Sequence, residues 1–582
     1  MARTVDPITL EVLNNRLREI VSTMEHLLFH GGYSTILRES KDGSAVITDR
    51  NGCAVYAGSQ LHLTPYHFTL QALLKQYPGD NMREGDSYIA NDPYLGGVFH
   101  ASDVAIVTPI FHQGVHLGFT ASIAHKSDIG GMVPGSASGA SRELYHEGFL
   151  VPGIKYATAQ GPIDDVVRLL MRNSRQPEAL RGDLQSQLGC TRVGADKVKG
   201  LCDEYGVETI LAAFQELQDL TEARVRHGLQ QWPDGEFSGE TEFEADGRLF
   251  VQPVRFNVRI RKQGDGITFD LTGSSPQVAS PQNIRPQSQL AAAALAMITS
   301  MDPSIPLNYG ALRPISLVSK PGLVTEAEFP APVGSYFAST AMLYSACLVA
   351  LANFNPARAV ASSGFGTSGP VLGYKQARSG KAAVSYELMS PSLGGTPLHD
   401  GSLAVNPMHQ YTPYTPVEIL ETEYPVRLER IETIIDSAGP GRFRGGLGYR
   451  KRYRVLSDCT LNFRRMQAGQ PQGIFGGLSP LRVRSSLNPD TPHEEVLTRS
   501  AAFELKSGTS FQFQSQGGSG YGDPLTRDTH RVLDDVLDGY VSVVGAERDY
   551  GVVIDAATMR VDEAATTARR HSAGVPGTPP RE

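Results

Sequence analysis

Two short stretches of the sequence each place a histidine three residues before an aspartate. His100 and Asp103 lie in FHASDVAIV, and His125 and Asp128 lie in AHKSDIGG. Two imidazoles and one carboxylate make an open site for Zn²⁺, Mn²⁺ or Fe²⁺, because three protein ligands leave room for water or substrate. A metal held there would lower the pKa of a water molecule and polarise a carbonyl oxygen.

Two further aspartates are candidates for the same site. Asp128 could orient an imidazole or accept a proton, and would then be catalytic together with His125. Asp42, in KDGS, is a candidate for an additional acidic ligand. The plainer interpretation makes each His-x-x-Asp pair a local cap or turn and Asp42 a turn residue. The residues alone leave both interpretations open.

A hairpin must position the two motifs. Residues 103–111 and 115–124 are strand-like and flank the short turn HQG. In an antiparallel hairpin centred on that turn, the numbers of paired residues add up to about 226. His125 is then expected opposite Ala101 and beside His100. The start of one strand and the end of the next therefore bring the imidazoles together.

One detail restricts this arrangement. His100 and Asp103 are three positions apart, and in a regular strand they would point to opposite faces. Both can serve one site only if residues 100–102 form a bend or a bulge. Gly96-Gly97 immediately before them favours such an irregular start.

Other segments carry weaker signals. The loop 130–148, rich in glycine and serine, is long enough to be a substrate lid, although a loose surface loop fits equally well. The clusters GPGRFRGGLG (439–448) and GGSGYGDP (517–524) could cradle an anion with backbone amides, or simply form tight turns. No G-x-x-x-x-G-K-[ST] phosphate loop and no G-x-S-x-G elbow occur in the sequence.

The periodicity of apolar residues predicts an α+β, multi-domain mixed α/β fold, with antiparallel hairpins at the metal site and a β-rich C-terminal region. A hairpin is expected around Asn51-Gly52. Helices are expected at residues 6–30, with Asp6 as cap, and at 67–77, most of 163–230, 288–301, 337–354, 529–543 and near 555–568. The expected divisions are an N-terminal metal-site domain, a helical segment, a central α/β domain, a β-rich domain and a disordered tail, at residues 1–160, 161–235, 236–417, 418–570 and 571–582.

Composition narrows the classes of partner. The formal net charge is -8 and the pI is about 6.0, so nucleic acid and anionic membranes are not the expected partners. The five cysteines include no C-x-x-C pair, which is typical of a reduced, cytoplasmic protein. No apolar run reaches the length of about 18 residues that would cross a bilayer.

At these motifs the sequence resembles the hydantoinase B family. That family includes the B subunits of ATP-dependent N-methylhydantoinases, the matching half of 5-oxoprolinase, and subunits of acetone and acetophenone carboxylases. The resemblance is carried, from residue 6 to about 528, by DPITLEVLNNRL, RESKDGSAVITDRNG, IANDPYLGGVFHASDVAIVTPIF, AHKSDIGG, NSRQPEALRGDLQSQ, PLNYGALRPI, DSAGPGRFRGGLG and GGSGYGDPLTRD.

The resemblance implies ligands and a partner. In carboxylase members two histidines and an aspartate hold a divalent metal, and these map onto His100, Asp103 and His125. A lactam-hydrolysing member adds an acidic ligand that maps onto Asp42. The family also implies an A-type subunit with an actin-like ATPase fold, which would bind ATP and Mg²⁺ and phosphorylate the substrate, in a heterotetramer or larger assembly.

Three functions are consistent with these features. The first is hydrolysis of a hydantoin or lactam ring after phosphorylation on the A-type subunit, with a metal-bound water as nucleophile. The second is ATP-dependent carboxylation of a ketone, of the acetone or acetophenone type. The third is a non-catalytic subunit that only stabilises its ATPase partner. The motifs are shared by both catalytic branches, and we expect the hydrolase.

Overall fold

The N-terminal part of the chain forms an antiparallel sheet that contains both histidine motifs. The computed structural model describes residues 5–78, 81–245, 250–365, 369–377, 379–405, 408, 413–464 and 468–572. The strand order of the sheet is β2-β1-β5-β4-β3-β6-β7. Its strands are β1 (Gly43–Asp49), β2 (Ala54–Ala57), β3 (Ser87–Ala90), β4 (Asp103–His112), β5 (Val115–His125), β6 (Ile154–Thr158) and β7 (Gly161–Pro162). The predicted hairpin around Asn51-Gly52 is the β1–β2 pair.

The predicted hairpin of β4 and β5 is confirmed, but its register differs from the expected one by two positions. Asp103, rather than Ala101, lies directly opposite His125. Residues paired across an antiparallel ladder point to the same face of the sheet. The observed register therefore places the Asp103 carboxylate beside the His125 imidazole.

The turn and a bulge explain the shift. Gln113 and Gly114 alone make the turn, both with positive φ, as in the two-residue turns that suit hairpins. His112 consequently pairs with Val115. A bulge between Ile110 and Phe111 moves the register by one further position. Neither step could be read from the alternation of apolar residues.

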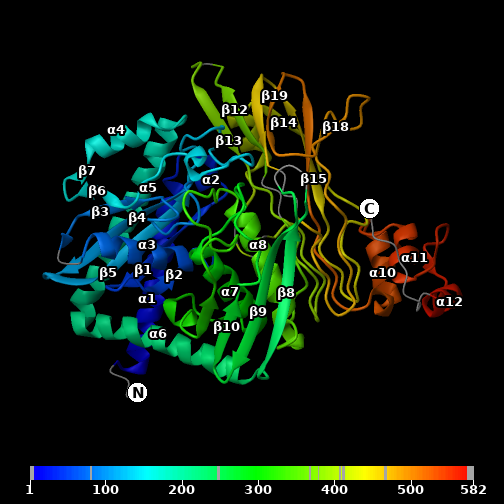
Figure 1. Ribbon diagram of the computed structural model, residues 1–582, viewed down its shortest axis with the longest axis horizontal. Helices are drawn as coiled ribbons and strands as arrows, with labels where there is room; N and C mark the ends of the chain where they lie inside the picture. Colours follow the sequence, from blue (N-terminus) through cyan, green and yellow to red (C-terminus); the bar gives the residue numbers. More distant parts are fainter. Residues whose placement is uncertain are drawn as a thin grey trace.

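Helices cover both faces of this sheet (Figure 1). On one face pack α1 (Pro7–His30), α5 (Pro177–Tyr205) and α6 (Val207–Gln230). On the other pack α3 (Leu63–Gln76) and α7 (Pro286–Met301). As predicted, Asp6 caps α1, accepting a hydrogen bond from the Thr9 N–H at 3.0 Å. The remaining helices of this half are α2 (Thr35–Arg38) and α4 (Asp164–Arg172).

The centre of the molecule is an apolar core around two helices. α7 and α8 (Tyr336–Leu351) are buried along almost their whole length and pack on a sheet of order β11-β10-β9-β8. Its strands are β8 (Gly235–Phe243), β9 (Val254–Gln263), β10 (Gly266–Asp270) and β11 (Ile315–Val318). Within the described ranges, no helix has both the length and the apolar character needed to cross a bilayer.

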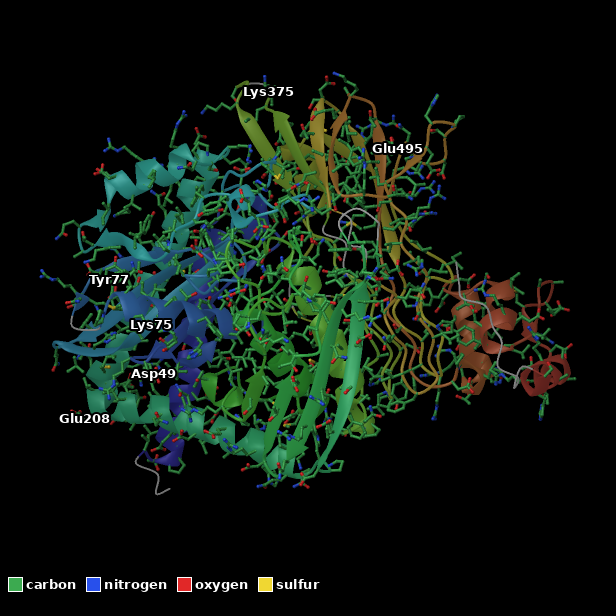
Figure 2. All side chains as sticks on the ribbon, in the orientation of Figure 1. Asp49, Lys75, Tyr77, Glu208, Lys375 and Glu495 are labelled. Atoms are coloured by element: carbon green, nitrogen blue, oxygen red, sulfur yellow. The ribbon has the colours of Figure 1, made fainter. Side chains whose placement is uncertain are left out.

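Two further sheets share the core of the C-terminal half. Their strand orders are β13-β12-β16-β19 and β14-β15-β20-β17-β18. Figure 2 shows Lys375 at the outer tip of the β12–β13 hairpin, so the other end of that hairpin points into the molecule. The strands are β12 (Val371–Lys375), β13 (Ala382–Tyr386), β14 (Val426–Thr433), β15 (Tyr449–Val455), β16 (Cys459–Phe463), β17 (Ser486–Leu487), β18 (Glu495–Val496), β19 (Ala501–Leu505) and β20 (Ser510–Ser515), with α9 (Val417–Glu423) before β14.

The two glycine-rich clusters lie side by side in extended segments, which Figure 1 shows as parallel traces between β8 and the C-terminal helices. The Gly439 N–H donates to the Gly518 carbonyl at 2.8 Å, and the Gly518 N–H donates to the Gly446 carbonyl at 2.9 Å. A Cβ on Gly518 would lie 1.9 Å from the Leu393 carbonyl oxygen. Glycine is needed here because backbones pack against one another, and these amides already have partners.

The C-terminal end differs from the prediction in detail. The helix expected at 529–543 is two helices, α10 (Thr529–Leu537) and α11 (Val543–Tyr550), because Gly539 takes a positive φ between them and Ser542 caps the second. The helix expected near 555–568 begins later, as α12 (Glu563–Ser572), after the short strands β21 (Ile554–Asp555) and β22 (Arg560–Val561). Of the predicted disordered tail 571–582, residues 571 and 572 instead form the end of α12, and residues 573–582 lie outside the described residues.

Candidate metal site

Three side chains meet where β4 begins and β5 ends. His100 Nε2 lies 3.1 Å from Asp103 Oδ1 and 3.2 Å from His125 Nδ1. His125 Nδ1 lies 3.4 Å from Asp103 Oδ1. All three side chains are buried. The cluster has the composition predicted from the two motifs.

A turn before β4 puts His100 and Asp103 on the same side. His100 lies outside the strand, and its carbonyl oxygen accepts a hydrogen bond from the Asp103 N–H at 3.1 Å. Gly97 has a φ of 75° and passes so close to α3 that a Cβ would lie 2.4 Å from the Phe68 backbone. The irregular start expected after Gly96-Gly97 is therefore present.

The cluster fits a divalent metal. Asp103 Oδ2 and His125 Nε2 are buried without a hydrogen-bond partner, an arrangement that is costly unless another group satisfies the cluster. Ligands held tetrahedrally at about 2.0–2.1 Å from a metal lie about 3.3 Å apart. The three separations, 3.1, 3.2 and 3.4 Å, are close to that value. Two imidazole nitrogens and one carboxylate suit Zn²⁺, Mn²⁺ or Fe²⁺.

Opposite charges within the cluster outweigh the effect of burial. Burial disfavours a protonated His100, yet the adjacent Asp103 carboxylate raises the pKa of that imidazole above its usual value. Burial would favour a neutral Asp103, but His100 and His125 lower the pKa of its carboxyl well below the usual range. Asp103 is therefore ionised, which is the form in which a carboxylate can bind a metal.

Asp42 supports the cluster from beside β1. Its carbonyl oxygen accepts a hydrogen bond from the His125 N–H at 3.0 Å. Its carboxylate lies near enough to help raise the pKa of His100. The ligand atoms that lie within 4.8 Å of one another belong to His100, Asp103 and His125 only, among the residues described. The role of Asp42 as a further ligand stays a prediction.

Asp128 is buried, and its carboxylate is engaged by the loop that follows it. Oδ1 accepts hydrogen bonds from the N–H groups of Gly130 (3.0 Å) and Arg175 (2.9 Å). Oδ2 accepts from the Gly135 N–H (3.1 Å) and from Arg175 Nη1 (2.9 Å). Across the described ranges, no hydrogen bond joins Asp128 to either imidazole of the cluster. This geometry is that of a loop anchor, and the predicted catalytic role of Asp128 stays a prediction.

The loop 130–148 is packed along its middle and fastened at its far end. Asn462 Nδ2 donates to the Ala137 carbonyl at 2.9 Å, and most residues around Ala137 are buried. Glu147 accepts a hydrogen bond from the Gly334 N–H at 2.7 Å, just before α8. Burial raises the pKa of Glu147 to about 7. A loose surface loop is therefore contradicted, whereas a lid stays a prediction.

Two tyrosines from distant parts of the chain border the cluster. Tyr336, the first residue of α8, has its ring centroid 4.7 Å from that of His100. Tyr386, the last residue of β13, lies 5.0 Å from the His125 ring. The Tyr386 hydroxyl accepts a hydrogen bond from Arg464 Nη2 at 2.7 Å. Sequence reasoning missed all three residues, because no local motif marks them.

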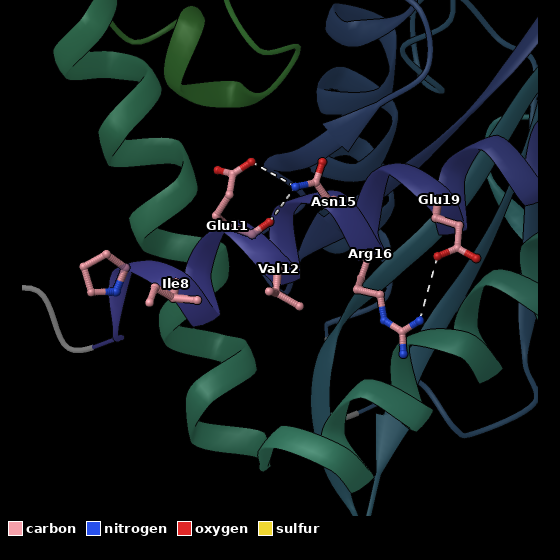
Figure 3. A pocket seen from close by; sticks show the side chains of 7 residues that line it. Ile8, Glu11, Val12, Asn15, Arg16 and Glu19 are labelled. Atoms are coloured by element: carbon pink, nitrogen blue, oxygen red, sulfur yellow. Dashed lines mark hydrogen bonds and ion pairs between the residues drawn. The ribbon is translucent and has the colours of Figure 1, made fainter.

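A shallow hollow on the outer side of α1 is a separate feature. Figure 3 shows it beside Ile8, Val12 and Arg16, which lie on the exposed side of the helix. Its volume is about 530 Å³. The hollow contains none of the predicted site residues, so it is not part of the candidate metal site.

Comparisons with known proteins agree with this architecture. The family model described as hydantoinase B/oxoprolinase matches residues 6–524. The chain is 30% identical to the caprolactamase beta subunit of Pseudomonas jessenii, over 97% of this chain and 99% of the relative. It is 29% identical to the putative D-/L-hydantoinase B subunit of Pseudomonas sp. (strain NS671), over 95% of this chain and 96% of the relative.

A solved structure is similar along the whole chain. The crystal structure of the ATP-dependent caprolactamase from Pseudomonas jessenii has a TM-score of 0.89 and 29% identity, and the match covers 98% of this chain and 100% of that chain. The family model spans most of the sequence, including both histidine motifs. The chain belongs to the hydantoinase B/oxoprolinase family.

Proposed function

We propose that this chain is the metal-carrying subunit of an ATP-dependent enzyme that opens a cyclic amide, a hydantoin or a lactam. The observation that carries the proposal is the buried cluster of His100, Asp103 and His125, whose atoms face one another at 3.1–3.4 Å. A buried set of this composition, with two orphaned polar atoms, suits an open metal site.

His100, Asp103 and His125 would hold the metal, and Asp42 lies close enough to support the set. A divalent ion held by these residues would make a water molecule more acidic and would polarise a carbonyl oxygen. Asp103 Oδ1 contacts both imidazoles and fixes their orientation. Asp103 Oδ2 is buried and unpaired, and the low pKa of its carboxyl suits a ligand rather than a proton acceptor.

The two tyrosines would hold the ring of the substrate. Tyr336 lies against His100 and Tyr386 lies against His125, so aromatic side chains border both imidazoles. Aromatic side chains offer flat apolar surfaces on which a planar cyclic amide can pack. The loop 130–148 would cover this region and limit the access of bulk water.

ATP would act on a separate polypeptide. An unstrained amide resists attack by water, and phosphorylation of its oxygen makes the ring carbon more electrophilic. Overall, one ATP and two water molecules would be consumed per ring opened, one to cleave the ring amide and one to release the phosphate, with ADP and phosphate as the other products. The sequence has no phosphate loop, and two similar relatives are named as a B subunit and a beta subunit. An A-type ATPase subunit in a hetero-oligomer is therefore the partner we propose.

The test is to co-purify the chain with its A-type subunit, measure bound metals by mass spectrometry, and follow ATP turnover with hydantoins, lactams and ketones, with and without bicarbonate. We expect about one divalent metal per chain and ring opening that needs no bicarbonate. Turnover confined to ketones plus bicarbonate would replace the hydrolase with a carboxylase.

The double variant His100→Ala, His125→Ala tests the site within the same assembly. We expect it to lose both the metal and ring opening while still assembling with the ATPase subunit. Replacing the exposed His26 and His30 of α1 with alanine is the matched control, because it removes two imidazoles without touching the cluster. Full metal content in the His100→Ala, His125→Ala variant would contradict the assignment of these histidines as metal ligands. Unchanged activity would favour a purely structural subunit.

A further inference from the structure

Arg464 is a buried arginine that forms no ion pair with a carboxylate of the described residues. It follows β16 and is 9% exposed. Nη2 donates to the Tyr386 hydroxyl at 2.7 Å, and Nε is buried with no hydrogen-bond partner. Within the described residues no carboxylate forms an ion pair with Arg464. A guanidinium cannot give up its proton in a protein, so the positive charge remains.

Other buried arginines of the same chain are neutralised. Arg527 lies within 2.7 Å of both Asp400 and Asp535, and Arg444 pairs with Asp535 at 2.9 Å. Burying a charge without a partner is expensive. The contrast indicates that the partner of Arg464 is a ligand rather than a side chain.

The position of Arg464 connects it to the candidate metal site. Its Cζ lies 5.6 Å from the centre of the Tyr386 ring, and that ring lies against His125 at 5.0 Å. Gly139, in the loop 130–148, passes next to the Arg464 backbone. Arg464 and Tyr386 thus belong to the wall that the C-terminal half adds to the cluster.

We propose that Arg464 and the Tyr386 hydroxyl form an anion subsite that holds the phosphate of a phosphorylated substrate beside the metal site. This proposal rests on the proposed function, in which the partner phosphorylates the amide oxygen. The hydroxyl of Tyr386 accepts from Arg464, which leaves its own hydrogen free to donate to a phosphate oxygen. Arginine is suited to phosphate because its planar N–H groups donate in pairs.

The subsite assigns a second task to this chain. The metal site would hold the carbonyl carbon that reacts. Arg464 would hold the phosphate attached to the oxygen of that carbonyl. A ring amide without phosphate would lack the ion pair and bind less tightly. The chain would therefore select the activated substrate over the free ring.

Binding of inorganic phosphate to the full-length chain tests the proposal by calorimetry, after removal of metal with a chelator so that a metal cannot bind the anion. We expect wild-type protein to bind phosphate and Arg464→Met to bind at least about tenfold more weakly, the loss typical of a charge-assisted hydrogen bond. Arg482→Met is the matched control, since Arg482 is exposed and pairs with Glu244; its phosphate affinity should equal that of the wild type.

Tyr386→Phe provides a second variant that keeps the ring and removes only the hydroxyl, and we expect phosphate binding several-fold weaker than in the wild type. Equal phosphate affinity in wild type and Arg464→Met, or no phosphate binding by wild type at millimolar concentration, would overturn the subsite. Metal content is measured separately on untreated protein. Arg464-dependent phosphate binding in a chain that never holds metal would support the subsite and refute the proposed function instead.

Discussion

At the scale of single residues, Asp103 joins the cluster together. Its Oδ1 faces both imidazoles, and their charges lower the pKa of its carboxyl. Local sequence was sufficient to select the three residues, because each motif lies at one end of a hairpin. It could not select Tyr336, Tyr386 or Arg464, which reach the site only through long-range packing.

The two aspartates near the imidazoles should differ in their effect on the metal. Asp103→Asn removes the negative charge from the centre of the cluster, and we expect loss of the bound metal. Asp42→Asn leaves the three-residue cluster intact, and we expect metal affinity to fall by about 10–100-fold, as for groups that support ligands. Competition with a fluorescent metal chelator measures both affinities. An equal loss of metal affinity in the two variants would show that Asp42 binds the metal directly, as Asp103 is proposed to do.

At the scale of elements, the loop 130–148 is held at both ends by buried carboxylates. Asp128 accepts four hydrogen bonds at its start, and Glu147 is bonded to the chain before α8 at its end. The sequence predicted a loop but not its state, because glycine and serine are equally common in loose and in packed loops. Its order depends on contacts with β12 and β16, far along the chain.

Replacing Asp128 separates an anchor from a catalytic base. In Asp128→Ala we expect faster proteolysis between residues 130 and 148, because Arg175 and two backbone amides lose their acceptor, while the metal content is unchanged. Limited trypsin and elastase digestion with mass spectrometry gives the cleavage sites. Asp165→Ala, which removes an exposed partner of Arg168, should digest like the wild type. Loss of activity without faster cleavage would favour the catalytic role.

The stability of the loop end should depend on pH through Glu147. Its carboxyl has a pKa of about 7 in the folded chain against a usual value of 4.5. Between these values the folded state holds a proton that the unfolded chain has released, so stability falls as pH rises from 4.5 to 7. The difference corresponds to about 3 kcal/mol. We expect the melting temperature of the wild type to drop across this range more than that of Glu147→Gln. Parallel pH curves for the two proteins would contradict this.

At the scale of the whole molecule, the candidate site draws on both halves of the chain. The N-terminal sheet supplies the imidazoles, α8 supplies Tyr336, and the sheet of β12, β13 and β16 supplies Tyr386 and Arg464. The fold class and most helices could be predicted from periodicity. The pairing of β12 with β16 could not, because it joins strands on either side of residue 418, where the composition suggested a division. The predicted domain limits stay a prediction.

The glycine-rich segments explain how the C-terminal half is kept together, and they allow a sharp test. A methyl group on Gly518 would lie 1.9 Å from the Leu393 carbonyl oxygen. Both backbones are held in place, because Gly518 is hydrogen-bonded to Gly439 and Gly446, and the Leu393 carbonyl accepts a hydrogen bond from the Gly446 N–H at 2.9 Å. We expect Gly518→Ala to destabilise the chain by about 3 kcal/mol or more, the upper range for overpacking.

Gly200→Ala is the control, because that helical position has open space around it and alanine favours helix by about 1 kcal/mol. Thermal unfolding of both variants decides: a Gly518→Ala protein as stable as the wild type would mean that the backbones are not packed this closely in solution.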